Sequence, residues 1–286
     1  MTPIAHHECG VTRPQSRHLG RLERSDGVVV DSDICQRGQI FGLPVGEGAQ
    51  NGHPDRFTGF SERDFRWGDP ELGQRVHEYL VKVGVETPTF QTALDRKDKI
   101  ELIEKDFAHI MQVLGLDLDD DSLAETPKRV AKMYVNEIFW GLDYEAFPKC
   151  TTVDNKMKYN EMVVERNVNV QSNCEHHFVV IDGLATVAYV PKQKVLGLSK
   201  INRIVEYFSK RPQIQERLTE QIFHTLQYIL ETVDVAVMID AQHYCVKSRG
   251  VEDTGSSTVT VRLGGGFKSD PSARAEFLSI ARQACK

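Results

Sequence analysis

Two short segments rich in cysteine and histidine place the strongest constraint on the fold, because they lie about seventy residues apart in the chain. The first is Cys174-Glu175-His176-His177 and the second is His243-Tyr244-Cys245. Thiolates and imidazoles are typical zinc donors, so a fold that uses both segments at one ion must bring them together. A site with three protein ligands also keeps a fourth position open for a reactive water.

The spacing within each segment suits a shared ion. Cys174 and His177 are three residues apart, so one turn of irregular chain can direct both side chains at one ion. His243 and Cys245 are two residues apart, and on a strand both would point to the same face. The preceding residues predict such a strand. One of its faces would carry Val235, Val237, Ile239 and Ala241, and the other would carry Ala236, Met238, Asp240 and Gln242.

The spacing alone leaves other interpretations of these clusters open. A buried free cysteine is often only a small hydrophobic residue. A structural zinc would use four closed protein ligands, whereas a catalytic zinc would use three. The two segments offer five candidate side chains, and their spacing does not decide which three or four of them bind.

Composition limits the class of protein. The chain has 286 residues, 40% of them hydrophobic, which is enough for one large core or two modest ones. A net charge of −6 argues against a general nucleic-acid-binding protein, which would present a basic face. The six cysteines are scattered and predict no disulfide framework, which suits a reducing compartment.

The sequence contains no obvious membrane or export segment. No apolar run approaches the roughly 18 residues that a membrane span needs. The N-terminal residues have no apolar core of the signal-peptide type. We therefore expect a soluble, cytoplasmic protein.

Residues 1–70 differ in composition from the rest of the chain. They are rich in Gly, Arg, Asp and Ser, and only one short run of valines resembles a strand. We therefore predict a disordered N-terminal extension, because such a segment can bury little surface. His6, His7 and Cys9 belong to this extension and are not expected to form a metal site.

Within residues 71–286 the hydrophobic pattern predicts helices first and strands afterwards. Predicted helices span 71–83, 96–115, 122–139, 200–210 and 213–232, and a last helix begins at Asp270-Pro271. Besides the His/Cys strand, predicted strands span 161–171, 178–190, 194–198 and 256–263. Ser122 to Glu125 matches a capping box, and Asp182-Gly183 matches a turn. This order predicts an α+β fold with antiparallel strands around a helical pair.

Two groups of basic residues could serve an anionic ligand. Ser199, Lys200 and Arg203 lie where a strand leads into a helix, and a helix N-terminus offers free N–H groups to a phosphate. Lys247 and Arg249 directly follow the His/Cys strand and place positive charge near it. An ordinary solvated surface is the alternative for the helix start.

Two further features occur on predicted helices. Arg129 and Lys132 are three residues apart on the 122–139 helix. Glu216, next to Gln215 at a helix start, offers a carboxylate to a donor-rich base edge. A solvated face explains the first pair equally well, and compensation of the helix dipole explains Glu216.

Five motifs follow one another along the chain, namely Glu125–Tyr134, Cys174–Phe178, Gly197–Ile204, Arg211–Leu218 and His243–Gly250. Together they closely resemble GTP cyclohydrolase I of the bacterial type. The resemblance covers residues 71–286 and leaves residues 1–70 outside.

The resemblance implies an enzyme that converts GTP and water into formate and 7,8-dihydroneopterin triphosphate, the first step toward folate and other pterins. It implies the tunnelling fold (T-fold), with N-terminal helices over 71–145 and a catalytic core over 146–286. Members of the family assemble into a ring-shaped homodecamer with active sites at subunit interfaces.

The resemblance also implies roles for individual residues. The ligands of Zn²⁺ would be Cys174, His177 and Cys245. The acid–base groups would be His176 and His243, with Ser199 near the ribose. Glu216 would anchor the guanine, with Gln215 beside it. The triphosphate would contact five cations, which are Lys200, Arg203, Arg249 and, from a neighbouring subunit, Arg129 and Lys132.

Two other functions compete with this one. A structural zinc protein with a scaffolding role would need a fourth fixed ligand and would have no use for the basic clusters. A nitrile reductase of the same superfamily uses a cysteine nucleophile and a nicotinamide cofactor, and should lack the three-ligand zinc set. The combination of Cys174, His177 and Cys245 with two free histidines favours the cyclohydrolase.

Overall fold

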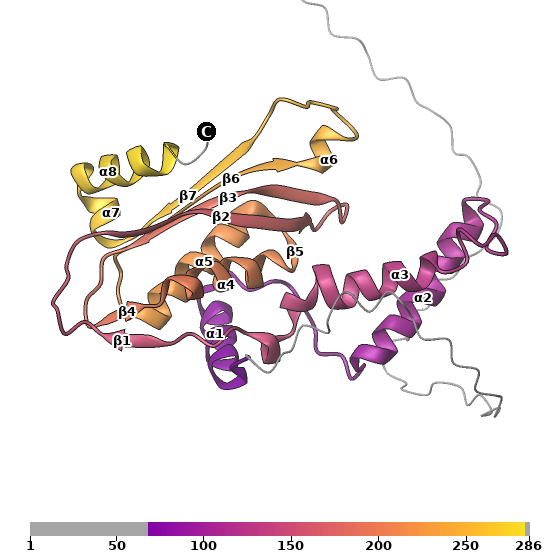
Figure 1. Ribbon diagram of the computed structural model, residues 1–286, viewed down its shortest axis with the longest axis horizontal. Helices are drawn as coiled ribbons and strands as arrows, with labels where there is room; N and C mark the ends of the chain where they lie inside the picture. Colours follow the sequence, from indigo (N-terminus) through magenta and orange to yellow (C-terminus); the bar gives the residue numbers. More distant parts are fainter. Residues whose placement is uncertain (1–67, 284–286) are drawn as a thin grey trace, which may run out of the picture. The chain divides into compact units, whose positions relative to one another are not determined.

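The computed structural model describes residues 68–283, and in this part of the chain helices come first and a five-stranded sheet follows (Figure 1). This arrangement confirms the predicted α+β class. The valine run and the residues His6, His7 and Cys9 lie outside the described residues. Among residues 68–283, none of the helices combines the length and apolar character that crossing a lipid bilayer requires.

The first two helices begin and end close to where the sequence predicts. Helix α1 spans Pro70–Val83 and α2 spans Arg96–Val113. The carboxylate of Asp69 accepts a hydrogen bond from Leu72 N at 3.0 Å and so caps α1. Gly84 ends α1 with a positive φ of 78°, a conformation that glycine adopts without strain.

The helix predicted over 122–139 is shorter than expected. Helix α3 begins at Thr126 and ends at Met133, and the chain continues as a π-helix, η2, over Tyr134–Ile138. Two short 3-10 turns follow, η3 over Trp140–Leu142 and η4 over Tyr144–Ala146. The capping-box prediction is wrong because α3 begins only at Thr126 with Glu125 as its N-cap residue, and Ser122 lies in the preceding turn, where its N and Oγ donate to Asp120 Oδ1.

The main sheet has the strand order β5-β2-β3-β6-β7. Its strands are β2 (Val163–Cys174), β3 (Val180–Tyr189), β5 (Pro212–Gln213), β6 (Val235–His243) and β7 (Thr258–Leu263). All neighbours are antiparallel except β5, which pairs in parallel with β2. The sheet is therefore mixed, which corrects the purely antiparallel prediction. Strands β1 (Thr152–Asp154) and β4 (Lys194–Leu196) form a separate antiparallel pair.

Asp182-Gly183, predicted as a turn, lies inside β3. Gly183 pairs with Val170 of β2 and with Ala241 of β6. A Cβ atom at Gly183 would lie 2.2 Å from the carbonyl oxygen of Asp240. The glycine is therefore needed for the close approach of two strands and not for a reversal of the chain.

Helices cover both faces of the main sheet. Figure 1 shows α4 (Leu198–Ser209) and α5 (Gln215–Leu230) on one face, and α7 (Gly265–Ser269) and α8 (Pro271–Arg282) on the other. As predicted, Asp270 caps α8, and its carboxylate accepts from Ser272 N at 2.8 Å.

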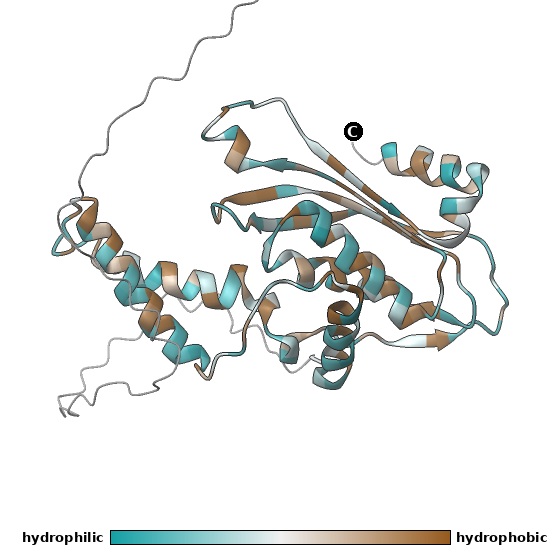
Figure 2. Ribbon diagram, turned by 180° about the vertical axis from the view of Figure 1, so that it is seen from behind, coloured by the Kyte–Doolittle hydropathy of each residue, from teal (hydrophilic) through white to brown (hydrophobic). Residues whose placement is uncertain are grey.

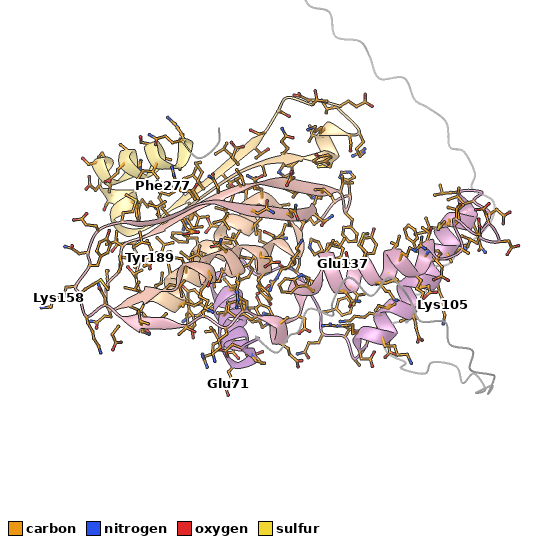
Figure 3. All side chains as sticks on the ribbon, viewed as in Figure 1. Glu71, Lys105, Glu137, Lys158, Tyr189 and Phe277 are labelled. Carbon is orange, nitrogen blue, oxygen red and sulfur yellow. The ribbon has the colours of Figure 1, made fainter. Side chains whose placement is uncertain are left out.

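The residues of β6 alternate between two hydrophobic cores, as the sequence predicts. Val235, Val237, Ile239 and Ala241 belong to the core beneath α4 and α5, whereas Ala236 and Met238 belong to the core beneath α8. Figure 2 shows hydrophobic residues on helices and strands where these layers meet. Figure 3 labels one residue of each core, Tyr189 of the first and Phe277 of the second.

Candidate functional site

The register of the sheet brings the two His/Cys segments to the same end of neighbouring strands. Strand β3 lies between β2 and β6, and its residue Ile181 pairs with Ser172 on one side and His243 on the other. Strand β2 ends two residues later at Cys174, and β6 ends at His243 itself. The fold therefore meets the constraint that a shared metal ion imposes.

Three of the candidate side chains form a compact cluster. One potential ligand atom from each of Cys174, His177 and Cys245 lies within 4.8 Å of the others. Cys174 is buried, Cys245 is half-buried and His177 is exposed. The cluster thus has one solvent-facing side, as a site that must admit substrate requires.

Cys245 does not lie on the strand with His243, contrary to the spacing argument. Strand β6 ends at His243, and residues Tyr244–Lys247 form the short helix α6, closed by a hydrogen bond from Ser248 N to Tyr244 O. This helical turn, and not strand alternation, directs the thiol of Cys245 toward Cys174.

The chemistry of the donors fits a zinc ion. The pKa of Cys245 is raised by burial and then by the neighbouring thiol of Cys174, with Arg249 acting in the opposite direction. Two thiolates this close repel each other, and a divalent cation between them would stabilise both. Two sulfurs and one imidazole nitrogen form a set that zinc commonly accepts in catalytic sites.

The loop that carries Cys174 and His177 is held in a tight turn. Phe178 N donates to the carbonyl oxygen of Cys174 at 2.8 Å, and Asn173 Nδ2 donates to the carbonyl oxygen of Phe178 at 3.2 Å. Phe178 has a φ of 53°, which is strained for a side chain of this size. The centroid of its ring lies 5.0 Å from that of Phe139, the C-cap residue of η2, and 6.2 Å from that of Tyr134 in η2. These aromatic contacts hold the strained residue in place.

An ion pair fixes the same loop to α5. Arg217 Nη1 lies 2.5 Å from Glu175 Oε2, and both side chains are largely buried. His176 is not one of the three clustered ligands, although its Nδ1 lies 3.6 Å from Cys174 Sγ, and its side chain is 64% exposed. The imidazole of His176 can therefore exchange protons with solvent or substrate. The hydrophobic pattern of the sequence does not predict this ion pair, although the place of Glu175 between Cys174 and His177 is a signal for it.

His243 is oriented by a buried glutamine. The side chain of Gln215 is 1% exposed, and its Nε2 lies 3.1 Å from Ile239 O, 2.8 Å from Thr258 O and 3.1 Å from Thr260 Oγ1. These acceptors fix the orientation of the amide, so that its oxygen faces His243 Nε2 at 2.8 Å. His243 therefore donates from Nε2, and Nδ1 of the neutral ring keeps a free lone pair.

Burial lowers the pKa of His243, and Glu216 partly opposes this effect. The neutral imidazole is favoured near neutral pH, which suits a group that accepts a proton. Glu216 itself is exposed in the first turn of α5. Arg249 also belongs to this region, because its Nη1 lies 2.9 Å from His177 Nε2.

Three residues predicted to bind substrate beside the metal cluster lie on α4 of the same chain, away from that cluster. Ser199, Lys200 and Arg203 occupy the first turns of α4, which has 12 residues and is therefore about 18 Å long. The opposite end of α4 leads to β5, where Gln213 pairs with Cys174. Along the axis of α4, Ser199 and Lys200 thus lie about 14–15 Å, and Arg203 about 9 Å, from the end of the helix that leads to β5.

The surroundings of Lys200 and Arg203 confirm this separation. Both cations lie close enough to the thiol of Cys150 to affect its pKa. Burial raises the pKa of Cys150 to about 12, and the charges of Lys200 and Arg203 oppose that rise. Arg129 and Lys132 are exposed on α3. Within residues 68–283, none of the hydrogen bonds or ion pairs joins Arg129 or Lys132 to the metal cluster.

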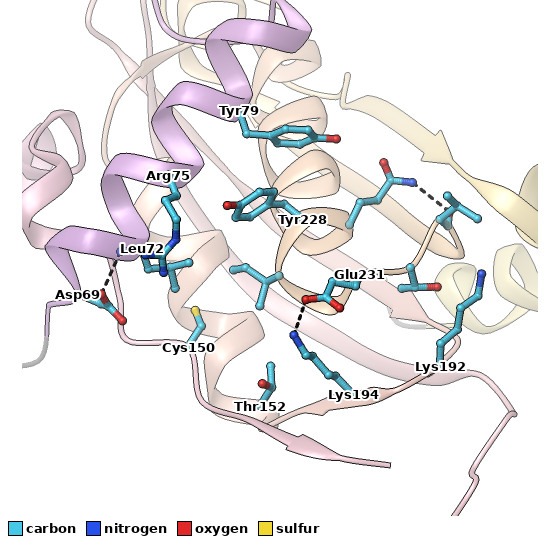
Figure 4. Close-up of a pocket in the computed structure, with 14 residues that line it drawn as sticks. Asp69, Leu72, Arg75, Tyr79, Cys150, Thr152, Lys192, Lys194, Tyr228 and Glu231 are labelled. Atoms are coloured by element: carbon cyan, nitrogen blue, oxygen red, sulfur yellow. Dashed lines mark hydrogen bonds and ion pairs between the residues drawn. The ribbon is translucent and has the colours of Figure 1, made fainter.

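A separate cavity of about 690 Å³ lies between α1, the C-terminal end of α5 and the β1–β4 pair (Figure 4). Tyr79 and Tyr228 stack in its wall with ring centroids 5.1 Å apart, and Arg75 and Cys150 also line it. None of the predicted catalytic, substrate-binding or metal-binding residues lines this cavity.

Comparison with known proteins gives the same family that the motifs suggest. The family model described as GTP cyclohydrolase I matches residues 103–282. The chain is 58% identical to GTP cyclohydrolase 1 of Shewanella amazonensis over 212 residues, which are 74% of this chain and 98% of that relative. It is 61% identical to GTP cyclohydrolase 1 of Aeromonas hydrophila over 204 residues, which are 71% of this chain and 94% of that relative. Agreement over nearly the whole length of these relatives leads to one conclusion: the chain belongs to the GTP cyclohydrolase I family.

Proposed function

We propose that Cys174, His177 and Cys245 bind Zn²⁺ and form the catalytic centre with which this GTP cyclohydrolase I converts GTP and water into formate and 7,8-dihydroneopterin triphosphate. The observation that carries the proposal is the convergence of these three ligand atoms to within 4.8 Å of one another from two distant segments. Zinc bound there would bring the pKa of a coordinated water near 7 and supply the nucleophile for C8 of the purine.

Two imidazoles are placed to move the protons that ring opening requires. His243 presents Nδ1 as its free lone pair, because Gln215 holds the opposite nitrogen. His176 lies on the exposed side of the loop. A positioned histidine suits general acid–base chemistry because its pKa lies near neutrality.

Recognition of the base rests on the start of α5. The exposed carboxylate of Glu216 lies close enough to His243 to affect its pKa. A carboxylate accepts hydrogen bonds from the N–H groups of guanine, which places the purine beside the metal cluster. Gln215 holds the start of α5 against the sheet, because its Nε2 faces three acceptors on β6 and β7.

The triphosphate requires more than one chain. Lys200 and Arg203 lie about 14 Å and 9 Å along α4 from the end that leads to β5, and no hydrogen bond or ion pair of the described residues joins Arg129 or Lys132 to the metal cluster. Only Arg249 of the five proposed cations lies beside the cluster. We therefore assign the remaining cations, with Ser199, to sites completed by neighbouring subunits of a homo-oligomer, and propose the ring-shaped decamer of the T-fold. The cytoplasm would keep the thiolates of such a site reduced.

An anaerobic assay of the purified full-length protein tests the function. Incubation with GTP should release formate and produce a fluorescent pterin in equal amounts, and removal of zinc by a chelator should abolish both. Bound zinc without formate release would show instead that the metal has only a structural role.

A further inference from the structure

Arg211 and Glu86 form a buried ion pair, although 125 residues separate them in the chain. Arg211 Nη1 lies 2.8 Å from Glu86 Oε1, and the two side chains are 1% and 11% exposed. Glu86 belongs to the segment between α1 and α2, and Arg211 lies between α4 and β5. The pair therefore joins the N-terminal helical region to the edge of the main sheet.

Two tyrosines and one phenylalanine surround the buried guanidinium of Arg211. Nη2 donates to Tyr207 Oη at 2.9 Å, and Nη1 donates to Tyr144 Oη at 3.3 Å. The guanidinium carbon lies 4.7 Å from the ring centroid of Tyr144, 4.8 Å from that of Tyr207 and 4.9 Å from that of Phe208. Tyr144 also donates its hydroxyl to Glu86. The two charges thus offset each other, although Arg211 Nε has no hydrogen-bond partner among the described residues, and removing either Glu86 or Arg211 would leave the other charge buried and unpaired.

The backbone that follows Arg211 supports the metal-binding strand directly. Ser172 Oγ donates to the carbonyl oxygen of Arg211 at 3.4 Å. Strand β5 pairs in parallel with the end of β2, and its Gln213 is opposite Cys174. The carbonyl oxygen of Gln213 then accepts from Glu175 N at 3.0 Å. The position of Cys174 therefore depends on the position of β5.

A second chain of hydrogen bonds connects β5 to the same N-terminal segment. Gln213 Nε2 donates to Gln221 Oε1 at 2.8 Å, and all of the side chain of Gln213 is buried. Gln221 Nε2 in turn donates to Val85 O and to Thr87 Oγ1, each at 3.0 Å. Residues 85–87 thus hold β5 from two directions, once through Arg211 and once through Gln221.

We propose that Glu86 and Arg211 are positioning residues for the metal ligand Cys174, acting through β5. The inference rests on the metal site proposed above. Cys174 is the buried ligand of the cluster, and β5 is only two residues long, so this short strand has little backbone pairing of its own to hold it. A displacement of β5 by a few tenths of an ångström would move the thiol relative to His177 and Cys245.

Glu86→Gln is the main test, because it removes the charge, keeps the size and leaves Arg211 without its carboxylate. We expect zinc affinity, measured by chelator competition on the full-length protein, to fall about 10-fold, the lower end of what outer partners of metal ligands contribute. The value of kcat should fall in proportion to the zinc that is lost, because a site without its metal would be inactive.

Two control variants separate positioning from loss of stability. Glu220→Gln breaks a Glu–Arg contact of similar chemistry, that of Glu220 with Arg262 at 3.1 Å, which makes no contact with β5. Phe277→Leu destabilises the other core, beneath α8. Both should bind zinc as tightly as the unmodified chain. The proposal would be overturned if Phe277→Leu and Glu86→Gln lowered Tm equally and also lowered zinc affinity equally.

Cobalt substitution distinguishes failure of this inference from failure of the metal site itself. The unmodified chain should show the thiolate-to-cobalt charge-transfer band, and its absence would refute the metal site. If the band is present and Glu86→Gln changes neither it nor the zinc affinity, the positioning role is refuted. Should Glu86→Gln not fold, Tyr144→Phe, which removes one hydroxyl and keeps both charges, is expected to give a smaller loss of zinc affinity, and an unchanged affinity would again refute it.

Discussion

His243 Nε2 donates a hydrogen bond to Gln215 Oε1 across 2.8 Å, from the end of one strand to the start of a buried helix. The amide of Gln215 has no freedom to turn, because its nitrogen already faces three acceptors. This contact leaves Nδ1 as the nitrogen of His243 that can accept a proton.

We expect His243→Ala and His176→Ala to retain zinc and to lose about a hundred- to ten-thousand-fold in turnover, the usual contribution of general acid–base catalysis. Zinc content per subunit and the rate of formate release should be measured on the same preparations. Loss of zinc from either variant would mean that the altered histidine is a ligand.

Cys174→Ser and Cys245→Ser should lose most of their zinc and nearly all turnover, because a hydroxyl is a much poorer zinc ligand than a thiolate. Circular dichroism should remain unchanged, since the sheet positions both segments. Cys150→Ser is the matched control, because Cys150 donates to Pro148 O and lies outside the cluster. Full activity in a zinc-free Cys174 variant would refute the metal site.

Arg129→Ala and Lys132→Ala should weaken GTP binding far more than guanosine binding, because only the phosphates would face these cations. Each charge-assisted contact contributes roughly 1.5–3 kcal/mol, which calorimetric titration resolves. Lys128→Ala, an exposed lysine on the same helix with no assigned role, should leave both affinities unchanged. Equal losses for GTP and guanosine would indicate a folding defect.

The same variants test whether sites form between subunits. If Arg129 serves the metal cluster of another chain, mixed oligomers of Arg129→Ala and His243→Ala contain some sites with neither substitution. Unfolding and refolding the two variants together should therefore restore part of the activity. Activity no higher than that of the separate variants would show that one chain supplies both residues.

Removal of residues 1–70 should leave folding, zinc binding, oligomer size and turnover similar to those of the full chain, since the extension is predicted to contribute neither core nor catalytic groups. Light scattering and the GTP assay measure the result. A chain beginning at Gly68 should be more stable than one beginning at Glu71 by about 1 kcal/mol, because it keeps the cap that Asp69 provides to α1. A smaller oligomer or a large drop in rate would give the extension a working role.

Local patterns in the sequence predicted the parts of the fold that depend on local chemistry. The pair Asp270-Pro271 predicts the cap of α8, whereas Asp69 caps α1 in the same way although it falls within the predicted extension, residues 1–70. The alternation along β6 predicted its two faces because a strand buried on both sides still separates its odd and even residues. The donor types also predicted a metal cluster, but the choice of Cys174, His177 and Cys245 among five candidates came from the family resemblance, and strand alternation did not place Cys245.

Features that depend on distant partners were not predictable in the same way. Strand β5 exists only because β2 offers a parallel neighbour, and two residues have no periodicity to detect. Gly183 has the sequence of a turn but is required by the backbone of β6. The place of Ser199 and Lys200 at the far end of α4 from Cys174 follows from the path of the chain, which their motif does not encode.

His177 cannot bind a metal ion and accept a hydrogen bond from Arg249 at Nε2 at the same time. A guanidinium has only N–H donors, so His177 Nε2 must be the acceptor in this 2.9 Å contact. A neutral imidazole that binds a metal through one nitrogen carries its proton on the other. Whichever nitrogen His177 gives to a metal ion, its Nε2 is then either coordinated or protonated, and it no longer accepts from Arg249. A metal ion in the proposed site would therefore deprive Arg249 of this acceptor and leave its guanidinium available to an anion such as the triphosphate.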